Sequence, residues 1–164
     1  KQINLHSNKY SIKQVYDSLT HTGGKVHWDK VVWNRAALPK HQFLMWLSIR
    51  SRLLTRDRLS RLGMSTETSC CLCQSGEETH LHLFSSVVLV ESRNYKGSRL
   101  RRQLYGAVVS ALAYRIWPAR NDMLWNQNRI SADSIVREVQ YVVKNRIQFV
   151  GRMSSLDKEW IDAL

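Results

Sequence analysis

The stretch Cys70-Cys-Leu-Cys-Gln-Ser-Gly-Glu-Glu-Thr-His-Leu-His-Leu-Phe84 decides how this chain is expected to fold. A Cys-x-x-Cys pair on a short loop is followed by histidines at the start of an apolar run. Two thiolates held on a tight turn and one imidazole from a helix supply three of the four ligands of a tetrahedral structural zinc site. The pattern therefore predicts a zinc knuckle between two helical parts of the chain.

The fourth zinc ligand is not evident from the pattern. One turn beyond His82 the chain reads Ser85-Ser86-Val87-Val88, and none of these side chains is a good zinc ligand. His80 or Cys71 could take the fourth position, although neighbouring residues on a helix or a tight turn point in different directions. The alternative is that three reduced cysteines and two histidines simply pack at a loop–helix junction.

Length and composition predict one domain carrying a helical extension. The chain has 164 residues, of which 43% are hydrophobic, and six tryptophans supply large packing units. We divide it into a zinc-knuckle domain over residues 1–92 and a long-helix extension over residues 93–164 that packs on it. No run approaches eighteen apolar residues, so no membrane span is expected. Three clustered cysteines favour a reducing compartment, and a first residue other than Met, Lys1, suggests a removed transit peptide or a fragment.

Charge is the strongest global feature of the sequence, with a formal net charge of +12. Residues 1–61 carry twelve basic and three acidic side chains, residues 62–92 carry no basic and four acidic ones, and residues 93–164 carry thirteen and six. The cysteine-rich segment is thus an acidic island between two basic blocks. Such a balance indicates a polyanionic partner, and without a membrane signal that partner is expected to be nucleic acid.

Apolar side chains recur at helical spacing throughout, and no segment alternates as a strand would, so the predicted fold class is all-α. The first half contains helices over 11–19, around 28–33, and over 40–54, the last being so apolar that we interpret it as the central core helix. A shorter helix from Thr55 to Gly63 follows. After the knuckle we expect helices over 81–90, from Ser98 to a bend or interruption at Pro118, and from Ser131 onward. In the tail, Leu156, Trp160 and Leu164 are expected to form a docking stripe.

Arginines crowd the end of the 40–54 helix and the helix after it, with Asp57 as the only counter-charge. They could form a solvated helical edge, but the planar guanidinium makes bidentate phosphate contacts, which favours a phosphate-binding ridge. A second basic group opens the helix at Ser98, where positive charge opposes the helix dipole. The predicted nucleic-acid-binding residues are Arg50, Arg52, Arg56, Arg58, Arg61, Lys96, Arg99, Arg101 and Arg102.

The apolar or polar character of the surrounding helical residues predicts which tryptophans are buried and which are exposed. Three lie in apolar faces and are predicted to be core residues, namely Trp33, Trp46 and Trp117. Trp125 and Trp160 are expected to be more exposed.

The order of these motifs resembles the zinc-binding domain downstream of the reverse transcriptase in plant non-LTR retrotransposons. The resemblance covers residues 10 to about 150. It is carried by Tyr10-Ser-Ile-Lys-Gln-Val-Tyr16, the two tryptophans of 28–33, Leu38-Pro-Lys-His-Gln-Phe-Leu-Met-Trp-Leu47, Arg52-Leu-Leu-Thr-Arg-Asp-Arg-Leu59, Cys70-x-x-Cys73, Glu78-Thr-x-x-His-Leu-Phe84 and Tyr114-Arg-Ile-Trp-Pro-Ala-Arg-Asn121.

The resemblance implies a ligand set of Cys70, Cys73 and His82. It also implies a fourth cysteine ligand at a position where this chain has Val87, so the family's site is incomplete here, with His80 as a substitute ligand. The sequence has neither a paired-aspartate polymerase signature nor a carboxylate cluster for two metals. We therefore expect a stand-alone derivative of a retrotransposon domain that has a non-catalytic task.

The leading functional hypothesis is a non-enzymatic, basic protein that binds structured RNA, with ribosomal RNA as the expected target, inside a ribonucleoprotein particle such as an organellar ribosome. The expected compartment is an organelle, mitochondrion before chloroplast, with nucleus or cytoplasm as the alternative. Neighbouring proteins of the particle are expected partners, and a small-molecule substrate is not. The competing hypotheses are a protein–protein adaptor that uses the tryptophan-rich helices and the tail stripe, and a nucleic-acid-binding fragment of a retrotransposon polyprotein. No spacing assembles a nucleophile with a base, so an enzyme is not expected.

Overall fold

The computed structural model describes residue 26 and the ranges 28–84, 98–147 and 155–162. Within these ranges the protein is helical, and the only β-type pairing is an isolated bridge between Ser69 and Glu77. The helix predicted over 11–19, residue Lys96 and the segment around Val87 lie outside the described residues. In the described ranges, no helix is both long and apolar enough to cross a membrane.

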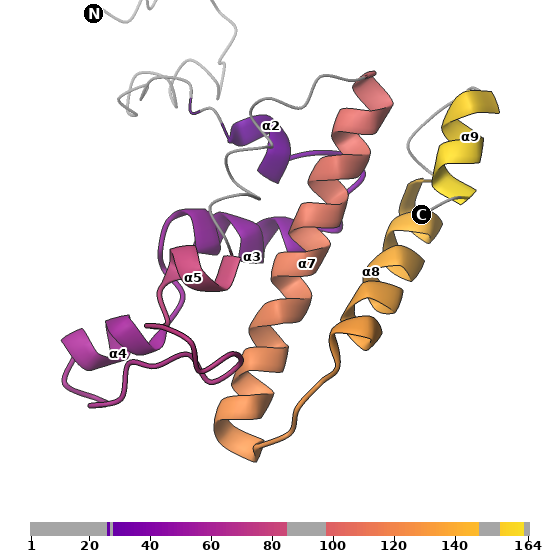
Figure 1. Ribbon diagram of the computed structural model, residues 1–164. Helices are drawn as coiled ribbons and strands as arrows, with labels where there is room; N and C mark the ends of the chain where they lie inside the picture. The colour runs from indigo at the N-terminus through magenta and orange to yellow at the C-terminus, as the bar shows by residue number, and fades with distance from the viewer. Residues whose placement is uncertain (1–25, 27, 85–97, 148–154, 163–164) are drawn as a thin grey trace, which may run out of the picture.

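The chain folds around the helix α7, Arg99–Asn126, which lies between two groups of smaller helices (Figure 1). On one side are α2 (Asp29–Val32), α3 (Pro39–Ile49), α4 (Arg56–Arg61) and α5 (His80–Phe84). On the other side are α8 (Ala132–Ile147) and α9 (Ser155–Asp162). The predicted all-α fold class, with a cysteine–histidine cluster between helical parts, is confirmed.

Two apolar clusters meet at α7 because its small and apolar side chains face in both directions. One cluster joins α7 to α8 and α9, and contains Leu104, Ala107, Ala111, Val139, Val143, Ile147 and Ile161. The other joins α7 to the first half of the chain, and contains Val109, Ala113, Val32, Met45, Leu53, Cys70, Leu83 and Phe84. Alanines bring the neighbouring helices close to α7, and burial of both faces makes this helix the centre of the core.

The central position of α7 corrects the prediction that the helix over 40–54 is the core helix. That helix, α3, ends at Ile49, and Ser51 beyond it has a left-handed backbone with a φ of 50°. Its buried residues are His41, Met45 and Ser48. Phe43 and Leu54, two of the apolar side chains in the 40–54 range, are 56% and 45% exposed. The helix therefore buries two polar side chains beside Met45 and turns Phe43 outward.

The close contact between α2 and α7 depends on Gly106. A Cβ at this position would lie 2.9 Å from Asn34 Nδ2 and 3.1 Å from the carbonyl oxygen of Val31. Asn34 is itself buried, donates to that carbonyl at 2.6 Å, and accepts a hydrogen bond from the backbone of Ala37 at 2.9 Å. The absence of a side chain at residue 106 thus lets α7 approach a fully bonded turn.

Helix starts follow the predicted capping residues. Ser98 Oγ accepts from the backbone N–H of Arg101 at the start of α7, and Ser131 Oγ accepts from that of Ser134 at the start of α8, both at 3.2 Å. Gly63 follows α4 with a φ of 70°, as expected for a residue that ends a helix. Of the predicted bend or interruption at Pro118, the interruption is wrong: α7 continues through this proline, whose side chain is exposed.

The tryptophans divide largely as predicted. Trp46 and Trp117 pack partly buried against the second cluster, and Trp125 is 72% exposed. The prediction that Trp33 is a core residue is wrong, because its side chain is 53% exposed. Trp33 directly follows the last residue of α2. The side chain of Trp160 lies outside the described residues, as do those of Leu156 and Leu164.

Candidate metal centre and basic groove

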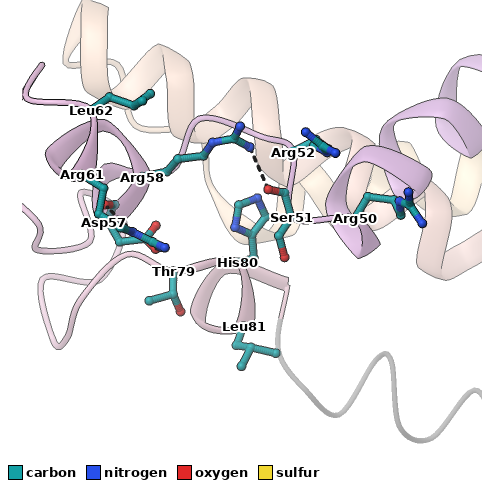
Figure 2. Close-up of a pocket in the computed structure, with 10 residues that line it drawn as sticks. All are labelled: Arg50, Ser51, Arg52, Asp57, Arg58, Arg61, Leu62, Thr79, His80 and Leu81. Atoms are coloured by element: carbon teal, nitrogen blue, oxygen red, sulfur yellow. Dashed lines mark hydrogen bonds and ion pairs between the residues drawn. The ribbon is translucent and has the colours of Figure 1, made fainter.

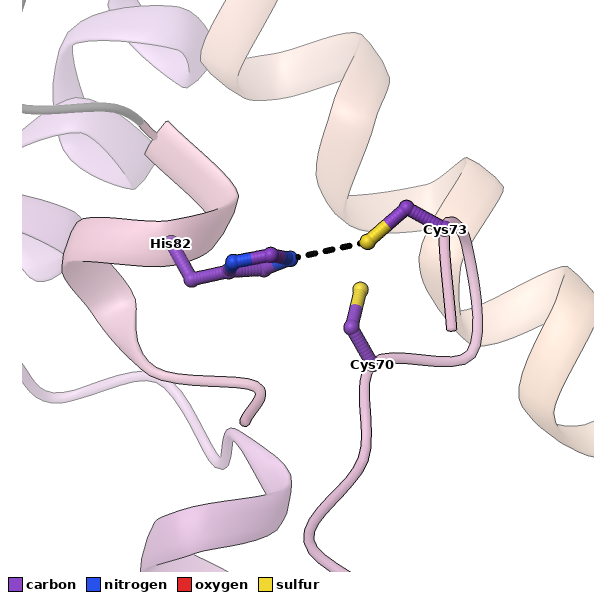
Figure 3. A group of neighbouring side chains, drawn as sticks. All are labelled: Cys70, Cys73 and His82. Atoms are coloured by element: carbon purple, nitrogen blue, oxygen red, sulfur yellow. Dashed lines mark hydrogen bonds between the residues drawn. The ribbon is translucent and has the colours of Figure 1, made fainter. Parts of the chain in front are cut away.

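Three metal-binding side chains converge where the knuckle loop meets α5 (Figure 3). Their donor atoms, from Cys70, Cys73 and His82, all lie within 4.8 Å of one another. Cys73 Sγ is 3.1 Å from His82 Nε2. Two thiolates and one imidazole are a donor set that structural zinc prefers, and this spacing suits a single ion. These residues fit zinc, which would cross-link the knuckle to α5 when bound.

Local hydrogen bonds place the two cysteines and the histidine. The loop turns at Gln74, whose backbone has a left-handed φ of 58° and donates to the carbonyl of Cys70 at 2.9 Å. The amide of Cys70 donates to the carbonyl of Gly76 at 2.8 Å, which closes the loop. On the other side, Thr79 Oγ1 accepts from the amide of His82 at 3.0 Å, as an N-cap residue does. The ligand positions are therefore fixed by the backbone of both elements.

The two thiols differ in acidity. The hydroxyl and backbone of Ser75, followed by His82 and Cys70, lower the pKa of the exposed Cys73 thiol to about 6. Burial raises the pKa of the Cys70 thiol, which is 1% exposed. Cys73 is thus a thiolate at neutral pH, the form in which cysteine binds metal.

Neither substitute for the fourth ligand joins this cluster. His80 points away from it, with Nδ1 3.4 Å from Thr55 Oγ1, and its Nε2 is buried without a hydrogen-bond partner in the described part of the chain. Cys71 is buried on the opposite side of the loop, with Sγ 3.6 Å from both Glu78 Oε2 and the carbonyl oxygen of Arg120. The described residues accordingly supply three ligands.

A buried ion pair, which the sequence analysis missed, ties the knuckle to α7. Arg120 donates to Glu78 Oε1 from Nε at 2.9 Å and from Nη2 at 2.5 Å, and the two side chains are 2% and 0% exposed. The same carboxylate oxygen accepts from the backbone N–H of Arg56 at 2.9 Å. Both partners stand inside motifs quoted above, but 42 residues separate them, and no local pattern indicates such a pairing.

A second site is a basic groove on the far side of α5, with a volume of about 610 Å³. Figure 2 shows Arg58, Arg52 and Arg50 in a row along the connection between α3 and α4, with His80 below them. Four of the five arginines predicted for the ridge line this groove. Its full lining is Arg50, Ser51, Arg52, Asp57, Arg58, Arg61, Leu62, Thr79, His80 and Leu81.

The arginines of the basic groove differ in how they are held. Arg58 donates to the carbonyl of Ser51 at 2.8 Å, and Arg61 pairs with the carboxylate of Asp57. The side chains of Arg50 and Arg52 are exposed, and their guanidiniums form no hydrogen bond or ion pair with the described part of the chain. Two guanidiniums are therefore positioned by the protein, and two are free to bind an anion.

Burial and charge also act on the titratable groups of the groove. Burial raises the pKa of the Asp57 carboxyl, but hydrogen bonds from Thr55 and Arg61 outweigh it and hold the pKa below the usual value. Burial lowers the pKa of His80. The groove at neutral pH hence contains four guanidiniums and one carboxylate.

The remaining predicted nucleic-acid-binding residues lie elsewhere. Arg56 is mostly buried, donates to the carbonyl of Ser69 at 2.7 Å and pairs with Glu67 at 2.9 Å, so it braces the knuckle loop. Arg99, Arg101 and Arg102 are in the first turn of α7 and do not line the groove. Of the two predicted basic groups, the structure thus places only the one that follows α3 beside the knuckle.

Comparison with known proteins agrees with the geometry of the metal centre. Residues 10–91 match the family described as zinc-binding in reverse transcriptase. The comparison with curated proteins found no match, and neither did the comparison with solved structures. The matched residues make up half of the chain and include the three converging ligands, so the chain belongs to the family of zinc-binding regions of reverse transcriptases.

Proposed function

We propose that this protein is a non-catalytic, retrotransposon-derived RNA-binding protein that contacts phosphates through its basic groove. The observation that supports this function best is the pair of exposed guanidiniums of Arg50 and Arg52, which have no partner among the described residues and lie beside two arginines held in place. Guanidinium groups bind phosphate oxygens in pairs, and the release of counterions from RNA makes such contacts favourable. The net charge of +12 acts in the same direction at longer range.

The proposal extends to the setting in which the protein acts. We place it in a ribonucleoprotein particle, with a mitochondrial ribosome as the first candidate, because a small basic helical protein can lie on structured RNA without reading its sequence. Co-sedimentation of the endogenous protein with ribosomal subunits from isolated mitochondria tests this part. Its presence only in fractions free of ribosomal RNA would contradict it.

The adaptor alternative relies on the tryptophan-rich helices and on the C-terminal helix as surfaces for another protein, and the second of these is partly used within the chain. Ile161 of α9 is 7% exposed and belongs to the cluster shared with α7 and α8. This helix already has a partner within the chain, which favours RNA binding over the adaptor.

The experiment compares two double variants that remove the same charge. Arg50→Gln/Arg52→Gln removes the free guanidiniums, whereas Arg137→Gln/Lys158→Gln removes two exposed cations on α8 and α9. RNA affinity is measured by fluorescence anisotropy across a salt series. We expect the groove variant to bind about tenfold or more weakly and its logarithmic salt slope to fall by about two, with a much smaller change in the control.

Two results would contradict the proposal. Equal losses in both variants would show that affinity follows net charge rather than the groove. A wild-type protein that does not bind RNA at physiological salt, and whose binding does not depend on salt, would exclude the function altogether.

A further inference from the structure

The outward face of α3 carries a stacked aromatic pair, of which only Trp46 packs against the core. Phe43 and Trp46 stack with ring centroids 5.9 Å apart and an interplanar angle of 26°. Phe43 is 56% exposed, whereas Trp46 is partly buried and packs against the second cluster. The buried residues of this helix, His41, Met45 and Ser48, lie on the opposite face. The packing of the described residues does not explain why the ring of Phe43, stacked on Trp46, is exposed.

This aromatic pair leads directly to the basic groove. Phe43, Trp46 and Arg50 follow one another at spacings of three and four residues, which places them along one face of the helix. Seven residues of helix separate Phe43 from Arg50 by about 10 Å. With one phosphate per about 3.4 Å of a stacked strand, that length corresponds to about three nucleotides.

We infer that the face of α3 formed by Phe43 and Trp46 is a stacking platform for unpaired bases of an RNA strand whose phosphates occupy the basic groove. The inference rests on the proposed function and narrows its substrate class to RNA with single-stranded segments. Bases of a duplex are already stacked on their neighbours, whereas unpaired bases stack on exposed aromatic rings. The adjacent free guanidiniums favour a polyanion over an apolar protein segment as the occupant of this face.

The test uses three ligands of equal length: a single-stranded adenosine oligomer, the same backbone without bases, and an RNA duplex. Phe43→Ala removes the exposed ring, and Phe43→Leu keeps an apolar side chain without a ring. Affinity is measured by anisotropy, and the free energy of unfolding of each variant is measured by urea denaturation.

We expect both Phe43 variants to bind the adenosine oligomer about tenfold more weakly, while binding of the abasic strand and the duplex stays unchanged. The logarithmic salt slope stays the same because no charge is lost. The fluorescence of wild-type protein should also be quenched by the adenosine oligomer more than by the abasic strand, since a base stacks near Trp46.

Other outcomes separate failure of the inference from failure of the function. If wild-type protein binds all three ligands with strong salt dependence and the Phe43 variants bind all of them equally well, the groove functions without a stacking platform. If Phe43→Ala lowers the unfolding free energy while every RNA affinity stays unchanged, another part of this chain covers the face, and the inference is wrong. If the wild-type protein binds none of the ligands, the proposed function fails along with it.

Discussion

Arg120 and Glu78 form a buried ion pair in which a guanidinium from α7 donates twice to one carboxylate oxygen at the base of the knuckle loop. Arg120 also lies over the ring of Trp117, with Cζ 5.0 Å from the ring centroid. Because α7 begins beyond the family match, this pair joins the matched segment to a helix outside it. The family region in this chain is therefore completed by residues that follow it.

Removal of either partner of this pair is expected to destabilise the protein strongly. Glu78→Gln or Arg120→Met leaves a buried charge without its counter-charge, and each should lower the free energy of unfolding by about 3–5 kcal/mol. The double variant should lose less than the sum, because it buries no unpaired charge. Urea denaturation of the four proteins provides the cycle, with Arg137→Met as an exposed control. Additive single effects would show that the residues act independently.

Zinc binding is expected to depend on three side chains and not on their neighbours. Native mass spectrometry of purified protein should find one zinc per chain, lost in Cys73→Ser and in His82→Gln. His80→Gln and Cys71→Ala should retain the metal, because neither side chain reaches the cluster. Loss of zinc in His80→Gln, with the helical circular dichroism unchanged, would mean that this histidine moves to complete the site.

Acid should destabilise the protein through His41. This residue is buried against the ring of Tyr114, with the two centroids 4.5 Å apart. Burial, followed by the charges of Lys40 and Arg115, lowers the pKa of His41 from 6.5 to about 4. Between these values the unfolded chain binds more protons than the folded one, so the free energy of unfolding should fall by about 2–3 kcal/mol as the pH drops through that window.

The His41→Gln variant isolates this effect. Urea midpoints measured from pH 7 to pH 4 should decline less steeply in His41→Gln than in the wild type. Burial also lowers the pKa of His80, so His80→Gln should flatten the same curve by a separate amount. An unchanged slope in His41→Gln would show that its imidazole becomes protonated without cost in the folded state.

Substitution of Gly106 by alanine should destabilise the protein although alanine favours helices. The propensity gain is about 1 kcal/mol, but the new methyl group would lie 3.1 Å from a backbone carbonyl of α2 that cannot easily move. We expect a net loss of about 1–3 kcal/mol in the free energy of unfolding. Gly76→Ala is the matched control, because its nearest neighbour would be 3.7 Å away. A Gly106→Ala variant that is as stable as the wild type would mean that α2 shifts freely.

The features that could be predicted from the sequence are those determined locally. A serine before an apolar run predicted the starts of α7 and α8. Of the site, the Cys-x-x-Cys spacing predicted that Cys70 and Cys73 act together, and the family resemblance implied His82 as their partner, whose donor atom lies beside theirs. Four of the five ridge arginines also line one groove, since they are close in sequence.

The features that could not be predicted depend on partners far along the chain. Apolar residues occur on every face of α3, so its sequence pattern alone does not identify the buried face. Contact with α7 decides it, with His41 inward and Phe43 outward. Pro118 is tolerated inside α7 because its ring faces solvent, while Ala119 beside it packs inward. The importance of Glu78 appears only when Arg120 is placed beside it.

The separation of Glu78 from Arg120 also sets an order of events during synthesis. The carboxylate emerges from the ribosome 42 residues before its guanidinium partner, an interval of about 2–8 s at usual elongation rates. During that time the knuckle sequence is exposed with its acidic residue unpaired and without the helix that forms half of its core. The metal-binding loop of this protein is thus translated before the helix that stabilises it. Chelators or proteases should therefore act on the nascent chain more readily than on the complete chain.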